Sequence, residues 1–235
     1  MKAIIMAAGK GCRISNEIGE VPKSTLIINE KSIIRNTVEI FILLGIEPIV
    51  CTGYKSENIK EALAGLKVRY YHNPFYDITN NIVSLWFAKE ELNDDVIILS
   101  ADVVFEKKIV EILMVQDNPL TMTVDSSRTL DGDFFFKLSD EGHILEYGPD
   151  LPENIRSCES LGLSKVRSNA IEVFSARLNE MIDEGKHALN FERIFHSFND
   201  DQIYRNRTVD VNGCIWREID FYHDYVKAKK QFEVI

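Results

Sequence analysis

The sequence predicts an α/β fold in which a mixed, mostly parallel sheet is flanked by helices. A short aliphatic run at residues 2–8 is followed by a glycine-containing loop, which is typical of a buried central strand. Strand-like and helix-like segments then alternate through the first half of the chain, and this alternation favours parallel strands joined by right-handed crossovers. The length of 235 residues fits one domain with a full core.

Local patterns predict the elements of the first half in order. Residues 32–44 have helical apolar spacing and stop at Gly45, as a helix does before a C-terminal glycine. The polar stretch 79–81 favours the start of a later helix. We expect an extended segment at 25–28, a helix at 32–44, a strand at 48–52, a helix at 56–64, a strand at 68–71, a helix at 81–92 and a strand at 96–99.

The pattern changes beyond about Asp125. Residues 134–138 and 144–147 indicate a hairpin across the turn at 140–142, which we expect to form a small β lobe. Helices are expected at 175–184 and 191–198, short strands at 209–211 and 215–218, and a last helix from about Phe221. We therefore expect one domain, 1–235, with a first half at about 1–125 and a second half at about 126–235.

The loop after the first strand has the composition of a phosphate-binding loop. Gly9 and Gly11 lack side chains where backbone N–H groups must approach an anion. Arg13 and Lys23 supply positive charge for a triphosphate and for the charge that develops in phosphoryl transfer. The alternative is a tight turn between strand and helix with incidental basic residues.

Two commoner phosphate loops do not fit these residues. A dinucleotide-binding loop needs a third glycine where Ile14 stands, and an acidic residue after the second strand, where residues 52–54 are Thr-Gly-Tyr. A P-loop needs glycines where Pro22 and Glu17 stand, ahead of Lys23.

The composition restricts which classes of partner and which cellular location we expect for this protein. The net charge of −10 argues against nucleic acid or an anionic membrane as the main partner, because both attract basic surfaces. No apolar run approaches the roughly 18 residues of a membrane span, and no signal-peptide pattern is visible, so we expect a cytoplasmic protein. The cysteines are scattered without metal-ligand spacing and are expected to be free thiols.

Two aspartates are candidate magnesium ligands. Asp102 follows an aliphatic strand and should project from the same sheet edge as the phosphate loop. Mg²⁺ takes one or two carboxylates together with substrate phosphates, and Asp220, at the start of the last helix, is the expected second ligand. The alternative for each aspartate is a turn or helix-capping role.

Further stretches carry a resemblance to a known family. They are Asn80-Asn81-x-x-Ser84-Leu85, Ser100-Ala101-Asp102 and Trp216-x-Glu218-Ile219-Asp220-x-x-x-Asp224. With the Ala-Ala-Gly-x-Gly-x-Arg loop and the later Pro-Lys pair, they resemble bacterial cytidylyltransferases that act on small phosphorylated alcohols or amines. Choline-phosphate cytidylyltransferases are similar, as are relatives that activate 2-aminoethylphosphonate, phosphoglutamine and inositol phosphate. The similarity extends from Met1 to Tyr225.

The resemblance implies a Rossmann-like sheet of the nucleotide-diphospho-sugar transferase type. It also implies a reaction of CTP with a phosphorylated acceptor, which gives a CDP-linked product and pyrophosphate. Arg13 would stabilise the leaving pyrophosphate, Lys23 would bind the α-phosphate and the incoming phosphate, and Mg²⁺ would lie on Asp102 and Asp220. The implied nucleotide ligands are Ala8, Gly9, Gly11, Arg13, Lys23, Asn81 and Ser84. One departure from the family is the short loop between Arg13 and Lys23, which lacks the usual Leu-x-Pro-Leu-Thr.

The polar stretch 79–84 suits a pyrimidine, because amides and a hydroxyl can match the donor and acceptor edge of the base. Capping of the helix by Asn80 or Asn81 is the alternative.

The acceptor should lie between the sheet edge and the second half of the chain. Candidate acceptor residues are Asp133, Glu159, Glu192 and Trp216, with Phe134 and Phe191 nearby in sequence. Carboxylates pair with an ammonium and aromatic faces attract a cation, so we expect a zwitterionic acceptor of the choline phosphate or 2-aminoethylphosphonate type. The alternatives are core positions for the aromatic residues and solvated positions for the acids.

Other functions also remain open from the sequence. One is a sugar-1-phosphate nucleotidyltransferase that uses UTP or dTTP. Another is a nucleotide-binding sensor that kept the fold and lost turnover.

Overall fold

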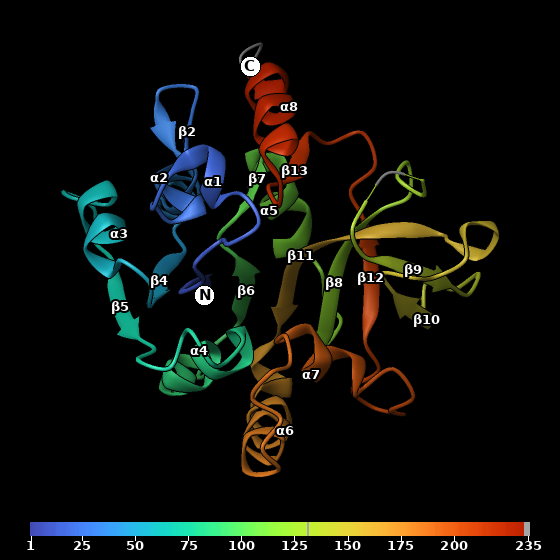
Figure 1. Cartoon of the computed structure of the whole chain (residues 1–235). Coiled ribbons are helices and arrows are strands. Elements are labelled where there is room, and N and C mark those ends of the chain that lie inside the picture. The colour runs from blue at the N-terminus through green and yellow to red at the C-terminus, as the bar shows by residue number, and fades with distance from the viewer. Residues whose placement is uncertain (131, 233–235) are drawn as a thin grey trace.

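A mixed sheet of nine strands forms the centre of the computed structural model, which describes residues 1–130 and 132–232 (Figure 1). One half of the sheet is parallel, in the order β6-β1-β4-β5. This order confirms the expectation drawn from the alternating first half of the sequence. The parallel strands are β1 (Lys2–Ala7), β4 (Glu47–Thr52), β5 (Arg69–His72) and β6 (Val96–Ser100).

The other half of the sheet is organised by a long strand, β11 (Cys158–Val166), which is antiparallel to β6, β8 and β9. Its register with β8 shifts between Ser160 and Ser164, around Gly162 with a φ of +72°. Such an irregularity lets a strand bend and change partners. The remaining strands of this half are β8 (Leu120–Asp125), β9 (Phe135–Leu138), β10 (Ile144–Gly148) and β12 (Arg207–Asp210).

The hairpin expected at residues 134–147 forms as β9 and β10. Cys158 and Glu159 of β11 pair with Phe136 and Phe135 of β9, so the hairpin extends the central sheet. The segment expected as a small lobe is therefore the end of the same sheet, because β11 is long enough to pair with both β6 and β9.

Helices cover both faces of the sheet. Side chains alternate along β1, so Ala3 and Ile5 pack on one face and Ile4 and Met6 pack on the other. The first face carries α2 (Ile33–Leu43), α3 (Ser56–Ala62) and α5 (Lys107–Met114). The second carries α4 (Asn81–Phe87), α6 (Ile171–Asp183) and α7 (Glu192–His196), which lie together in the lower part of Figure 1.

A third apolar cluster joins the C-terminal helix α8 (Tyr222–Phe232) to the segment after β1. β13 (Trp216–Glu218) pairs antiparallel with β7 (Val103–Phe105), and the Ile219 N–H donates to the Asp102 carbonyl at 3.0 Å. These contacts place residues 218–220 beside Asp102. The segment between β1 and α2 also contains short elements, namely α1 (Ser15–Ile18), β2 (Ile27–Ile28) and β3 (Lys31–Ser32).

Some predicted boundaries are wrong. The helix expected at 81–92 ends at Phe87, and a 3₁₀ turn, Lys89–Glu91, follows it. This turn brings the buried Glu91 carboxylate to Lys2 and Arg69, where it accepts hydrogen bonds from both. Helix α6 begins at Ile171 rather than at 175, since a 3₁₀ turn at Ser168–Ala170 leads into it. Within the described residues, no helix is long and apolar enough to cross a membrane.

Candidate active site

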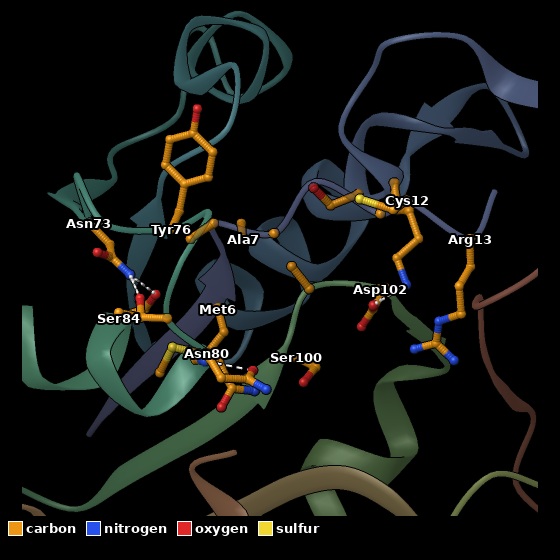
Figure 2. Close-up of a pocket in the computed structure, with 18 residues that line it drawn as sticks. Met6, Ala7, Cys12, Arg13, Asn73, Tyr76, Asn80, Ser84, Ser100 and Asp102 are labelled. Carbon is orange, nitrogen blue, oxygen red and sulfur yellow. Dashed lines mark hydrogen bonds and ion pairs between the residues drawn. The ribbon is translucent and has the colours of Figure 1, made fainter. Parts of the chain in front are cut away.

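The loop after β1 lines a cavity of about 320 Å³ at the carboxyl ends of β1 and β6, called here the first cavity. Figure 2 shows Asn73, Tyr76 and Ser84 toward one end of it and Asp102 and Arg13 toward the other. The residues expected to bind a nucleotide all line this cavity: Ala8, Gly9, Gly11, Arg13, Lys23, Asn81 and Ser84.

Gly11 is required by the shape of the loop. Its φ is +63°, and a Cβ built on it would stand 2.5 Å from Lys23 Cγ, which is closer than real atoms approach. Any side chain at this position would therefore displace the stem of Lys23. A Cβ on Gly9, in contrast, would meet none of the described atoms within 4 Å, which leaves room for a ligand.

We expect Gly11→Ala to lower kcat by about 10- to 100-fold, because small displacements of a phosphate-binding group are costly in catalysis. Steady-state rates and thermal melts of purified variants test this. Gly65→Ala is the matched control, because Gly65 has a φ of +83° and open space around it among the described residues. It should lose stability through the same backbone strain and keep full activity. If the two alanine variants are equally active, displacement of Lys23 does not account for any loss of activity in Gly11→Ala.

Lys23 lies between two carboxylates. Its Nζ is 2.7 Å from Asp102 Oδ2 and 2.8 Å from Asp220 Oδ1. Burial by itself would lower the pKa of Lys23, but the attraction of Asp102 and Asp220 outweighs it and raises the pKa above its ordinary value. The ammonium therefore stays charged at neutral pH.

Arg13 approaches the same site from the solvent side. Its Nη1 is 2.8 Å from Asp220 Oδ2, while its side chain is 59% exposed. The guanidinium lies over the ring of Phe221, 5.5 Å from the centroid. Arg13 thus lies at the mouth of the first cavity, with much of its side chain open to solvent.

The ligand oxygens of Asp102, Glu218 and Asp220 lie within 4.8 Å of one another and form a carboxylate cluster. Asp102 Oδ1 is buried and has no hydrogen-bond partner in the part of the chain that the structure describes. Burial, followed by repulsion from Asp102 and Asp220, raises the pKa of Glu218 well above its ordinary value. A divalent cation with a preference for oxygen ligands fits these residues, because it would satisfy the unpaired oxygen and relieve the repulsion.

Glu218 was not singled out as a ligand from the sequence. The signal was its spacing, because Glu218 and Asp220 are two residues apart at the end of a strand-like segment and can share one side of an extended chain. The capping alternative for Asp220 receives no support from its contacts, since its carboxylate binds Lys23 and Arg13. Asp224 takes the capping role, and its Oδ2 accepts from the Phe221 N–H at 2.9 Å.

The opposite end of the first cavity is lined by amides and hydroxyls. Ser84 Oγ accepts from Asn73 Nδ2 at 3.0 Å, and both residues are almost completely buried. Asn73 follows β5 and was missed, although its place after a parallel strand is a recognisable signal. The capping alternative is confirmed for Asn80, which accepts from the Asn81 N–H at 2.7 Å. Asn81 Oδ1 accepts from the Phe191 N–H at 2.7 Å and so ties α4 to the second half of the chain.

A second missed residue is Gly53, which follows β4. A Cβ on Gly53 would stand 2.8 Å from the Ala8 carbonyl oxygen and 2.6 Å from Tyr76 Cβ. The Tyr54 N–H donates to the same Ala8 carbonyl at 3.0 Å. Only glycine allows Tyr76 to pack so closely on the start of the phosphate loop and to form a wall of the first cavity.

A second cavity of about 390 Å³ adjoins the first, and Arg13 and Ser100 line both. Of the four residues expected to bind an acceptor, Asp133 and Glu192 line it. Glu218 and Asp220 lie on its boundary as well, so the carboxylate cluster sits where the two cavities meet. The carboxylate cluster is thus bordered by a cavity on each side.

The other two expected acceptor residues are buried beneath this surface. Trp216 is 1% exposed, and its indole N–H donates to Asp125 Oδ2 at 2.8 Å. Glu159 is 3% exposed and accepts from Arg128 at 3.2 Å. The structure gives no support to direct contact of Trp216 and Glu159 with the acceptor, because their polar atoms are engaged in the core around Arg128. Phe191 is likewise a core residue.

Glu192 makes stability depend on pH. Burial, more than the nearby charge of Asp102, raises the pKa of Glu192 from 4.5 to about 7. Because the folded state holds this proton more tightly than the unfolded chain, the stabilisation is complete below pH 4.5 and is lost as pH rises to about 7. At about 1.4 kcal/mol per pH unit, the loss is at most about 3.5 kcal/mol.

We expect Glu192→Gln to abolish this loss. Melting temperatures in Mg²⁺-free buffer should be similar for the two proteins at pH 5, and the variant should melt several degrees higher at pH 8. Glu172→Gln, at an exposed position of α6, is the control and should follow the parent protein. Parallel curves for Glu192→Gln and the parent would show that Glu192 titrates normally.

Comparison with known proteins agrees with this geometry. The model of the MobA-like NTP transferase domain matches residues 3–169, which include β1, the phosphate loop and Asp102. The chain belongs to this family. This membership agrees with the phosphate-binding loop predicted from the sequence.

Two curated relatives and one solved structure extend the comparison. CTP:phosphoglutamine cytidylyltransferase of Campylobacter jejuni is 29% identical over 95% of this chain and 97% of its own length. CMP-5'-(3-aminopropyl)phosphonate synthase of Streptomyces rubellomurinus is 32% identical over 55% of this chain, but the match spans only 21% of that longer protein. The structure of CTP:phosphocholine cytidylyltransferase from Streptococcus pneumoniae has a TM-score of 0.76 at 21% identity, with 97% of each chain covered. This last similarity confirms the predicted fold class.

Proposed function

We propose that this protein is a nucleotidyltransferase that transfers a cytidylyl group from CTP to a small phosphorylated or phosphonate-bearing amine, with release of pyrophosphate. The observation that carries the proposal is the position of the carboxylate cluster and Lys23 between the two cavities. The nucleotide would occupy the first cavity and the acceptor the second. The relative named CTP:phosphoglutamine cytidylyltransferase supports CTP as the donor.

Mg²⁺ is the cofactor in this proposal, held by Asp102 and Asp220 with Glu218 beside them. It would supply positive charge to the phosphates of the nucleotide. Lys23 would then exchange its contacts with the aspartates for the α-phosphate and the incoming phosphate. Arg13, at the mouth of the first cavity, would neutralise charge on the departing pyrophosphate.

The chemistry needs no protein nucleophile, because a phosphate or phosphonate oxygen of the acceptor is already anionic. That oxygen attacks the α-phosphorus of CTP. A new P–O bond forms as the bond to the β-phosphate oxygen breaks, and pyrophosphate leaves with the electron pair. The contribution of the protein is positioning and charge neutralisation. We place this reaction in the cytoplasm, where nucleoside triphosphates are available.

Pyrophosphate release with a panel of nucleotides and acceptors tests the proposal. CTP should exceed ATP and GTP by at least about 100-fold in kcat/KM, because a purine is larger than cytosine and presents a different hydrogen-bonding edge to the pocket lined by Asn73 and Ser84. Amine-bearing phosphates and phosphonates should react faster than glycerol phosphate and glucose 1-phosphate. Preferred turnover of glucose 1-phosphate with UTP or dTTP would indicate a sugar-nucleotide enzyme. Binding of CTP without turnover of any acceptor would indicate a sensor.

A further inference from the structure

Two side chains of α7 face the second cavity and take no part in the proposed chemistry. Glu192 and His196 are four residues apart, so they lie on the same side of the helix, and both line the cavity. α7 is positioned by Phe195 and Ile194, which are buried in the core on its opposite side. Both residues therefore border the second cavity on one side of the helix.

Both side chains have buried polar atoms without a partner. Glu192 Oε2 and the two ring nitrogens of His196 form no hydrogen bond with any described residue, and His196 is only 6% exposed. Burial, with a smaller effect of Arg193, lowers the pKa of His196 to about 3, so its ring is neutral. Unpaired buried polar groups are rare in folded proteins, and a ligand that satisfies them is one explanation of such a pair.

The hydrogen-bonding capacity of this pair suits a cation that carries N–H groups. Glu192 accepts hydrogen bonds, and one nitrogen of a neutral imidazole accepts as well. A primary ammonium offers three N–H donors. A quaternary ammonium offers none and would leave Glu192 Oε2 and His196 unpaired.

The aromatic surface around the pair does not form an open cage for a quaternary ammonium. Tyr147 stacks on the face of His196 at 3.7 Å with an interplanar angle of 6°, and the edge of Phe136 closes against the ring at 5.4 Å. Among the described Phe, Tyr and Trp side chains, Phe134 lines the second cavity. Recognition of quaternary ammonium groups depends on several exposed ring faces, which here are used for packing.

The charges that face α7 across the cavity are consistent with a cationic group. The carboxylates of Asp133, Glu218 and Asp220 line it together with Glu192, against the two guanidinium groups of Arg13 and Arg193. Arg193 is exposed and donates to the Tyr147 hydroxyl at 3.0 Å. Arg13 is held by Asp220 at the junction with the first cavity.

We infer that Glu192 and His196 form a subsite for a primary ammonium group, so that the acceptor is a phosphorylated or phosphonate-bearing primary amine rather than a trimethylated one. This inference rests on the proposed function and narrows its acceptor class. Glu192 accepts from the ammonium, His196 accepts through one ring nitrogen, and the phosphate end of the acceptor points toward Lys23.

Phosphoethanolamine and phosphocholine provide the test, because they differ only in three N-methyl groups. At pH 8 with CTP and Mg²⁺, phosphoethanolamine should have a KM at least tenfold lower. Glu192→Gln should raise this KM at least tenfold and leave the KM for CTP and the weak use of phosphocholine unchanged. His196→Phe, which keeps an aromatic ring in the stack, should lose the discrimination between the two acceptors. Glu172→Gln is the control and should behave as the parent protein.

Calorimetric titration of the two acceptors into the protein, saturated with a non-hydrolysable CTP analogue, separates this inference from the proposed function. Tighter binding of phosphoethanolamine than of phosphocholine supports the subsite even if pyrophosphate is not released, in which case the proposed function alone fails. Equal or tighter binding of phosphocholine, or an equal effect of Glu192→Gln on both acceptors, overturns the subsite. Melting curves identify any variant that is unfolded. In that case the comparison of the two acceptors on the parent protein decides whether the subsite prefers a primary ammonium.

Discussion

Replacing Lys23 with alanine is expected to lower kcat by about 10²–10³-fold, because the ammonium group would neutralise charge on the phosphoryl group as it is transferred. The KM for CTP should rise less than kcat falls if the contact is strongest in the transition state. The melting temperature in Mg²⁺ should change little by comparison, since the metal would compensate Asp102 and Asp220. Steady-state pyrophosphate release and thermal melts measure both effects.

Two further variants separate charge from packing at this position. Lys23→Met keeps the stem that packs on Gly11 and removes only the ammonium, so it should be as slow as Lys23→Ala. Lys31→Ala removes a lysine from an exposed pair with Glu39 and should leave the rate unchanged. A rate for Lys23→Met within a few fold of the parent would remove Lys23 from the mechanism.

Asp102→Asn and Asp220→Asn are expected to lower activity at 1 mM Mg²⁺ by about 10²-fold each, because a neutral amide cannot replace a carboxylate at a hard cation. Higher Mg²⁺ concentrations should restore part of the rate. Chelation with EDTA should abolish activity of the parent protein reversibly. Magnesium titrations of the rate and of the melting temperature provide two independent readouts.

Neighbouring substitutions define the ligand set. Glu218→Gln tests whether the third carboxylate of the cluster contributes to metal affinity, and we expect a smaller loss than at Asp102. Asp224→Asn is the matched control, since the amide oxygen of asparagine can accept the same bond from the Phe221 N–H and the rate should be kept. If only Asp102→Asn changes the response to Mg²⁺, the ligand role of Asp220 is excluded and its carboxylate serves only Lys23 and Arg13.

The parts of the site that sequence reasoning could anticipate are local. Gly9, Gly11 and Arg13 lie in one loop directly after a strand, and the end of a central parallel strand is where ligands bind. Asp102 follows from the same argument applied to β6. Burial of Trp216 and Glu159 could not be anticipated in this way. An acidic or aromatic residue has the same sequence signature whether it lines a cavity or bonds to Arg128 and Asp125 beneath it.

By itself, the sequence determined the parallel half of the sheet, the phosphate loop and the candidate charges at its end, because strand period, glycine placement and residue chemistry act over a few neighbouring residues. Tertiary structure decided which distant residues share the site. The pairing of β13 with β7 brings Glu218 and Asp220 to Asp102, and the bend in β11 joins the hairpin to the sheet. The pairing of β13 with β7 joins segments more than 100 residues apart, and the bend in β11 depends on its packing against several other strands, so no local pattern specifies either contact.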